Sequence, residues 1–281
     1  MNKLYYAFLV YAWLSFSPIW AQEQIHVRKL LKVSQFPLPS AGQGEWVLSA
    51  SPQWWLYMAS SSGIIAQFDT LGSELRKASK SKWLEGSYLD AKAGVRLFLF
   101  SQEAQQAYWI DRLLGQSQEV VLGQEAFFSA LAPSPNGGFW GFDTYTLSLL
   151  NLSLNGGSSV QHTIPLLGTA LAKDQQDLQC RHIAVNHGRV YAFFEQGTLA
   201  VWSNTGAYLG KSSIPNLLGF DLSGNYLYAW TAEQLLQFQP ENLAQPIRAW
   251  PLPKGNWKHW AISSPYIFGQ NAQGISVFRM E

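Results

Sequence analysis

One short sequence pattern occurs six times along this chain, and it constrains the fold more than any other feature. Each copy places apolar residues around a polar position and is followed by a turn. The apolar anchors of the six copies are Phe68, Ile110, Leu150, Trp202, Phe238 and Phe278. Successive anchors are 42, 40, 52, 36 and 40 residues apart. A period of about 40 residues indicates a repeat architecture, in which each unit is one supersecondary structure that packs against its neighbours.

Each anchor lies in a segment typical of a small antiparallel sheet. In the fifth unit, strands are expected over residues 217–220 and 226–230, with a turn over residues 222–225 between them. Aromatic and β-branched runs bounded by Gly, Asn and Ser favour strands over helices. A fourth strand is expected after each anchor, for example over residues 208–212 in the fourth unit. The chain is therefore predicted to be all-β, a six-bladed β-propeller of four-stranded blades.

In this pattern the chain, over about residues 25–281, resembles the β-propeller superfamily, with blades similar in general to WD40-like and quinoprotein-like repeats. The Gly-His and Trp-Asp signatures of WD40 repeats are missing, and residues 69–72 keep only the Asp-x-x-Gly part of a quinoprotein repeat. No specific family is matched. The resemblance therefore implies a fold, and it implies no catalytic or cofactor residue.

The sixth unit supplies three strands up to Glu281, whereas residues 25–33 form a spare strand before the first unit. We expect this N-terminal strand to pair with the last blade and close the ring. Closure would remove the open sheet edges that invite aggregation.

Residues 1–21 have the pattern of a secretory signal peptide, with Lys3, an apolar run over residues 4–16 and a cleavage site before Gln22. This predicts one propeller domain over residues 22–281, exported to the periplasm or the extracellular space, with peripheral attachment to the outer membrane left open. An uncleaved N-terminal anchor is the alternative. The single cysteine, Cys180, is interpreted as a small buried apolar residue, with intermolecular pairing as the alternative.

The overall charge disfavours a nucleic-acid partner. The formal net charge is +1 and the isoelectric point is near 7.8, whereas a nucleic-acid-binding domain carries a basic face. A partner protein is the expected ligand.

Tryptophans near predicted blade connections form the first group of candidate binding residues. Trp83, Trp250 and Trp257 lie in predicted connections, Trp260 lies at the following strand, and basic residues are interleaved with them. The candidate contact residues are Lys80, Lys82, Trp83, Trp257, Lys258, His259 and Trp260. Lys80 and Lys82 belong to a basic run that suits an acidic partner. The alternative for the tryptophans is packing under the loops, and the alternative for the basic run is a charged loop exposed to solvent.

Acidic residues form the second group. Glu103, Asp143, Glu195 and Glu233 fall in predicted turns between the second and third strands of four successive blades. Equivalent turns would point toward one mouth of the central channel, where carboxylates could bind a cation or act as acid and base. Charge tolerated in exposed turns is the alternative. His182 and His187 straddle a predicted hairpin, but two imidazoles without a neighbouring carboxylate or cysteine are a weak indication of zinc, and an exposed turn histidine or a buried hydrogen-bonded one is favoured.

These patterns favour a non-catalytic binding or scaffolding propeller that mediates protein–protein interaction in a bacterial cell envelope. No cofactor, metal or catalytic residue is assigned. Two alternatives remain open: a hydrolase or lyase acting on a glycan or lactone at the channel mouth, and a lectin-like sugar-binding propeller. The oligomeric state is left open.

Overall fold

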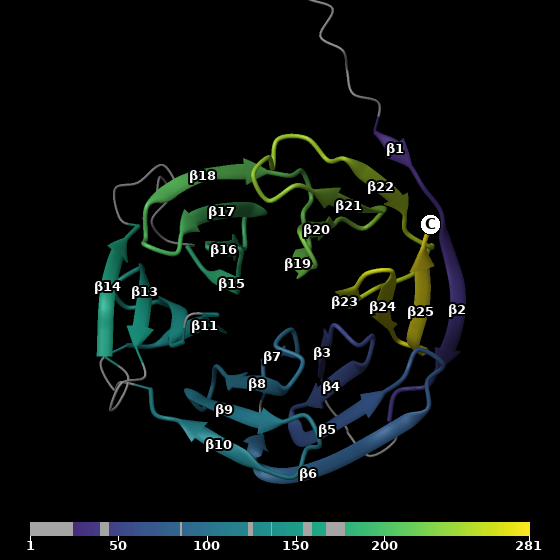
Figure 1. Cartoon of the computed structure of the whole chain (residues 1–281), viewed down its shortest axis with the longest axis horizontal. Coiled ribbons are helices and arrows are strands. Elements are labelled where there is room, and N and C mark those ends of the chain that lie inside the picture. Colours follow the sequence, from purple (N-terminus) through teal and green to yellow (C-terminus); the bar gives the residue numbers. More distant parts are fainter. Residues whose placement is uncertain are drawn as a thin grey trace, which may run out of the picture.

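The computed structural model describes residues 25–39, 45–84, 86–122, 126–135, 137–153, 159–166 and 178–281. Six sheets are arranged around a central axis like the blades of a fan (Figure 1). The part of the chain that the structure describes contains strands and turns and no helix, so no helix there could cross a membrane. The prediction of a six-bladed, all-β propeller is confirmed.

The first three blades follow one another along the chain. Blade 1 contains β3 (Trp46–Ala50), β4 (Leu56–Ser60), β5 (Ser62–Phe68) and β6 (Glu74–Leu84). Blade 2 contains β7 (Tyr88–Asp90), β8 (Arg96–Ser101), β9 (Gln106–Asp111) and β10 (Ser117–Val120). Blade 3 contains β11 (Phe128–Pro133), β12 (Phe139–Asp143), β13 (Ser148–Ser153) and β14 (Ser159–Pro165).

The other three blades complete the ring. Blade 4 contains β15 (Cys180–Asn186), β16 (Arg189–Phe194), β17 (Thr198–Ser203) and β18 (Tyr208–Ser213). Blade 5 contains β19 (Gly219–Ser223), β20 (Tyr226–Trp230), β21 (Gln234–Phe238) and β22 (Arg248–Pro251). Blade 6 contains β23 (His259–Ser263), β24 (Tyr266–Asn271), β25 (Gly274–Met280) and the N-terminal strand β2 (Leu30–Phe36). The first strand of every blade lies nearest the axis (Figure 1).

The N-terminal segment closes the ring, as predicted. Strand β2 pairs antiparallel with β25, with Leu30 opposite Met280 and Phe36 opposite Ile275. The short strand β1 (His26–Val27) was not foreseen: it pairs parallel with β22 and adds a fifth strand to blade 5. The same segment therefore ties together the outer edges of blades 5 and 6.

The apolar core lies between adjacent blades. Aromatic rings meet across these interfaces, such as Phe98 with Phe139 at 5.1 Å between ring centroids and Phe142 with Phe194 at 5.7 Å. All six repeat anchors are buried, each at most 5% exposed. The repeat pattern is thus a packing pattern: each anchor fills the interface that its blade makes with the rest of the ring.

Two local predictions differ from the structure. The basic run before Trp83 was expected in a connection between blades, but it lies on β6, an outer strand of 11 residues. A register shift between the Ser62 and Ile64 pairs lets β6 continue to Leu84. Lysines on an outer strand oppose edge-to-edge association of sheets, which gives the run a structural role. Trp250 likewise lies within β22 and not in a connection.

Cys180 is buried, as interpreted from the sequence, and burial raises the pKa of its thiol well above the usual range. A buried protonated thiol is a poor nucleophile.

Candidate functional site

The inner strands enclose a central cavity of about 780 Å³. Its walls come from the first strands of the blades and from the turns that follow them, including residues 133–135 and 223–224. The first strand of each blade lies nearest the axis, so side chains from these strands and from their turns line the cavity. Charged and aromatic side chains both occur in this lining.

A lysine side chain spans the cavity. Lys92, in the turn after β7 of blade 2, donates from its Nζ to Asp221 Oδ2 of blade 5 at 2.9 Å and to the Ile262 carbonyl of blade 6 at 2.5 Å. The backbone N–H of Ile262 donates to the same Asp221 oxygen at 2.8 Å. Three blades are therefore joined through one ion pair, whose side chains are 29% and 15% exposed.

A second carboxyl group, that of Asp90, lies beside this bridge. Its Oδ1 accepts the Lys92 backbone N–H at 2.7 Å, and its Oδ2 lies 3.4 Å from the Tyr88 hydroxyl. Burial raises the pKa of Asp90 above its ordinary value, while the Lys92 N–H and charge act in the opposite direction. Burial also raises the pKa of Tyr88. Both groups therefore favour their neutral forms relative to free side chains.

His182, on β15 of blade 4, completes this polar group. Its ring stacks on Phe220 at 4.7 Å between centroids and lies 5.3 Å from the Tyr88 ring. Burial lowers the pKa of His182 to about 4, with the nearby Asp221 charge opposing the effect. The imidazole is therefore neutral near pH 7. The cavity presents hydrogen-bonding groups around an ion pair that is already satisfied.

Aromatic residues form the rest of the wall. The Arg96 guanidinium lies over the Trp109 ring at 3.9 Å, a cation–π contact. Trp230 and Trp260 also line the cavity, and each ring lies over a glycine of the paired strand, Gly219 and Gly269 respectively. Glycine at these positions leaves the space that the indole rings occupy.

The structure divides the first group of sequence-predicted residues. Lys258, His259 and Trp260 line the cavity, and burial lowers the pKa of His259. Trp257 packs on Trp260 at 4.8 Å and donates its indole N–H to the Pro253 carbonyl, so it supports the cavity wall from behind.

Lys80, Lys82 and Trp83 lie elsewhere, on the outer strand β6. Trp83 is 1% exposed and packs between blades 1 and 2. The Lys80 Nζ lies 4.9 Å from the centre of the Trp83 ring, and the Lys82 Nζ lies 5.6 Å from that of Tyr108. Both lysines thus cover aromatic rings at the outer edge of the propeller.

Three of the four predicted carboxylates, Glu103, Glu195 and Glu233, lie in turns between second and third strands, whereas Asp143 is the last residue of the second strand β12; none of the four lines the cavity. The second and third strands are set back from the axis, so their turns lie away from the channel mouth. Asp143 is 1% exposed and accepts the Phe127 N–H at 3.0 Å, which makes it a turn-stabilising residue. Glu195 pairs at 2.9 Å with Arg181, which lines the cavity. Glu103 and Glu233 are exposed.

Among the described residues, no group of three His, Cys, Asp or Glu side chains is arranged to hold a metal ion. The two hairpin histidines separate: His182 faces the cavity, while His187 is exposed and contacts the Gly224 carbonyl at 3.1 Å.

Sequence reasoning missed four residues of the central group: Tyr88, Asp90, Lys92 and Asp221. A signal was present, because Asp90 and Asp221 are both the third residue of the first strand of their blades. A carboxylate in an otherwise apolar innermost strand is a candidate for the axis of a propeller. This signal is visible only when the first strands of the blades are aligned with one another.

Comparison with known proteins supports the fold alone. No protein-family model and no curated protein matches the chain. The WD40 domain of Neurospora crassa Pan2 is similar in structure, with a TM-score of 0.60, 11% identity, and coverage of 90% of this chain and 97% of that one. A streptogramin B lyase has a TM-score of 0.58, 11% identity, and coverage of 88% and 97%.

A third similar structure, YCF48 bound to D1 peptide, has a TM-score of 0.51, 11% identity, and coverage of 83% of this chain and 77% of that one. At these identities the likeness concerns the backbone. The chain therefore has the fold of a six-bladed β-propeller, and its candidate site lies at the axis of the ring.

Proposed function

We propose that this protein is a non-catalytic binding propeller of a bacterial cell envelope, and that it holds an acidic segment of a partner protein at the central cavity. The observation that carries the proposal is the cavity itself. Its volume of about 780 Å³ lies within the range of about 300–1,000 Å³ usual for ligand sites. Its lining combines aromatic side chains with a few fixed polar groups, as binding sites do.

The charge of the lining indicates an acidic partner. Arg96 and Lys258 are exposed cavity residues without an ion-pair partner among the described residues, whereas Asp221 is neutralised by Lys92. Exposed cations steer an acidic segment toward the cavity and give register to the complex. A propeller of similar fold, YCF48, is described with a bound peptide, which gives a precedent for peptide binding by this architecture.

The first experiment locates the binding surface by site-specific photocrosslinking in the native host. A photoreactive residue replaces Leu218, a cavity residue that is 53% exposed, or Val160, an outer-strand residue that is 52% exposed. We expect one envelope protein to crosslink at position 218 and not at position 160. Crosslinking at position 160 alone, or at neither position, would overturn the proposal.

Charge reversal then tests the chemistry of the interface. Arg96→Glu and Lys258→Glu should each weaken binding of the captured partner by about 3- to 10-fold, because rim charges contribute modestly and mainly to association. Lys77→Glu on the exposed face of β6 is the matched control. Loss of binding in Lys80→Glu and Lys82→Glu, with Arg96→Glu unaffected, would move the interface to β6.

Export is part of the same proposal. Residues 1–21 lie outside the described residues, and their sequence pattern supports cleavage before Gln22. N-terminal sequencing of the protein from a periplasmic or culture-supernatant fraction should begin at Gln22. A chain that retains Met1 in the membrane fraction would support an anchor instead.

One observation favours an enzyme as the second candidate. Asp90 and His182 have pKa values shifted toward their neutral forms, and both lie beside Tyr88 in the cavity. Shifted pKa values gather at catalytic sites, and one similar fold is that of a streptogramin B lyase. Incubation with streptogramin B, followed by mass spectrometry, tests this candidate. Turnover that is lost in Asp90→Asn would favour the lyase or hydrolase over the binding proposal.

A further inference from the structure

Two blades share a cross-strand triad of polar residues. In blade 1, Tyr57, Gln67 and Arg76 are register partners on the second, third and fourth strands. In blade 5 the same order of residue types recurs as Tyr228, Gln237 and Arg248. The backbone positions are equivalent, so differences between the triads come from what covers them.

The triad of blade 1 is covered by the next blade. Arg76 donates to Gln67 Oε1 at 2.8 Å, and the Tyr57 hydroxyl reaches the Arg112 carbonyl at 3.5 Å. Arg112 belongs to the turn that joins β9 to β10, and Leu114 of that turn is 3% exposed and packs in the same apolar cluster as Tyr57. The hairpin turn of blade 2 therefore fills the space over the triad.

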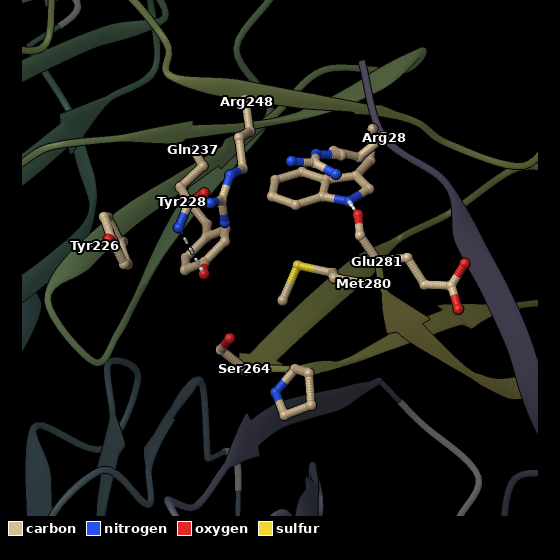
Figure 2. A pocket seen from close by; sticks show the side chains of 10 residues that line it. Arg28, Tyr226, Tyr228, Gln237, Arg248, Ser264, Met280 and Glu281 are labelled. Carbon is tan, nitrogen blue, oxygen red and sulfur yellow. Dashed lines mark hydrogen bonds between the residues drawn. The ribbon is translucent and has the colours of Figure 1, made fainter. Parts of the chain in front are cut away.

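No hairpin turn lies over the triad of blade 5, because the neighbour of blade 5 is the closing blade. The third and fourth strands of blade 6 are β25 and β2, which come from opposite parts of the chain and are not joined by a hairpin turn. We call the junction of β25 with β2 the seam of the ring. A cavity of about 290 Å³ lies at this seam, and Figure 2 shows it from close by. The lining of this seam pocket includes Arg28, Tyr228, Gln237, Arg248, Trp250 and Glu281.

The floor of the seam pocket is buried and contains an unpaired polar atom. Tyr228, Gln237 and Trp250 are each 2% exposed. Gln237 Nε2 donates to the Tyr228 hydroxyl at 3.1 Å, but among the described residues Gln237 Oε1 has no hydrogen-bond partner. A buried unpaired acceptor is costly, and a ligand that donates a hydrogen bond would satisfy it.

The rim of the seam pocket carries two arginines. Arg28 and Arg248 extend from the end of β1 and from β22 over the pocket, while the Glu281 carboxylate points away from Arg28 (Figure 2). Within the described ranges, neither guanidinium has a hydrogen bond or an ion pair, in contrast to Arg76 of blade 1. Two free planar guanidiniums fit a carboxylate or phosphate group, which each can bind through paired hydrogen bonds.

We propose that the seam pocket binds a small hydroxylated oxyanion of about monosaccharide size, such as a sugar acid or a sugar phosphate. Arg28 and Arg248 hold the oxyanion, a hydroxyl group of the ligand donates to Gln237 Oε1, and the Tyr228 and Trp250 side chains contact its carbon skeleton. The site is separate from the central cavity and does not depend on the function proposed for that cavity.

Isothermal titration calorimetry on residues 22–281 tests the proposal with D-glucuronate, glucose 1-phosphate and D-glucose. We expect at least one of the two anions to bind, and neutral D-glucose to bind at least about tenfold more weakly. Arg28→Gln and Arg248→Gln should each lower the affinity for the bound anion by about tenfold or more, because each removes a charged hydrogen-bond donor. Preference between the two anions distinguishes a carboxylate from a phosphate ligand.

Arg76→Gln in the covered triad of blade 1 is the matched control and should leave binding unchanged. Unfolding midpoints of all variants establish that each is folded; both rim arginines are exposed, so large losses of stability are not expected. Absence of binding by both anions would overturn the proposal. So would equal binding of D-glucose, or an equal loss of affinity in Arg76→Gln.

Discussion

Two glycines shape the wall of the central cavity. Gly219 lies opposite Trp230 and Gly269 lies opposite Trp260 in their antiparallel pairs. A Cβ atom at either glycine would lie 2.4 Å from an atom of the facing indole ring. Both tryptophans line the cavity, so these positions link the backbone directly to the shape of the site.

Gly269→Ala should therefore destabilise the protein. The new methyl group would force Trp260 or the strands apart, and overpacking of this kind costs about 1–3 kcal/mol. Urea unfolding of the two proteins measures the difference. Gly115→Ala is the control, because its nearest neighbour would be 3.6 Å away in an exposed turn; its effect should stay within about 0.5 kcal/mol. Equal effects of the two changes would contradict this account.

His182 predicts a pH dependence of stability. Burial lowers the folded-state pKa of His182 from 6.5 to about 4, so between these values the unfolded chain binds a proton that the folded chain does not. The contribution of His182 to the free energy of unfolding is therefore fully present above about pH 6.5 and decreases as the pH drops toward 4. A difference of one in pKa corresponds to about 1.4 kcal/mol, which places the loss on the order of 2–3 kcal/mol.

The control for this prediction is His182→Gln, which cannot titrate. Urea midpoints measured from pH 7.5 to pH 4.5 should fall less steeply in the variant than in the natural protein. Carboxyl groups such as Asp90 titrate in both proteins, so the comparison isolates the imidazole. Parallel pH profiles would show that His182 is not held neutral.

At the scale of elements, the N-terminal strand β2 closes the ring. It covers the edge of β25, and Phe36 at its end stacks on Phe68 of blade 1 at 5.2 Å between ring centroids. The strand thus pairs within one blade and packs against the next.

A chain that starts at Leu38 should be less stable than one that starts at Leu30. The shorter chain loses β2, exposes the edge of β25 and removes the Phe36 ring, a loss of about 3–5 kcal/mol for a buried aromatic side chain alone. The freed edge should also promote association. Chemical unfolding and gel filtration measure both effects. The chain that starts at Leu30 lacks only β1 and serves as the control, and equal behaviour of the two would contradict a closing role for β2.

The elements also show how far sequence reasoning reaches. Blade number, strand order and the closing strand were predictable, because buried anchors such as Phe68 and Trp202 repeat with the period of a blade. The extent of β6 was not, since exposed lysines resemble a loop until the pairing with β5 is known. Lys258, His259 and Trp260 were singled out by their place in and beside a predicted blade connection, and they line the cavity. The Lys92–Asp221 bridge joins residues 129 positions apart, a distance that no local pattern reports.

At the scale of the whole molecule, the ring has one seam, where β25 meets β2. There the backbone N–H of Glu281 donates to the Lys29 carbonyl at 3.1 Å, directly beyond the pair of Met280 with Leu30. In each of the other blades, the four strands that form the blade are consecutive along the chain. The seam thus lies where the chain happens to begin and end. The contacts between blades do not require the seam to lie in blade 6.

A circular permutant tests this inference. An Asn-Gly turn joins Glu281 to Lys29, the spacing of a two-residue hairpin, and the chain is opened in the turn between Thr205 and Gly206. Strand β18 then becomes the closing strand, and blade 4 takes the role of blade 6. Because the contacts between blades are kept and opening a turn changes loop entropy little, the permutant should fold and unfold cooperatively. Its urea midpoint should lie near that of the linear chain that starts at Leu30, which also lacks β1. A permutant that stays unfolded while this linear control folds would show that closure in blade 6 is itself required for the ring to form.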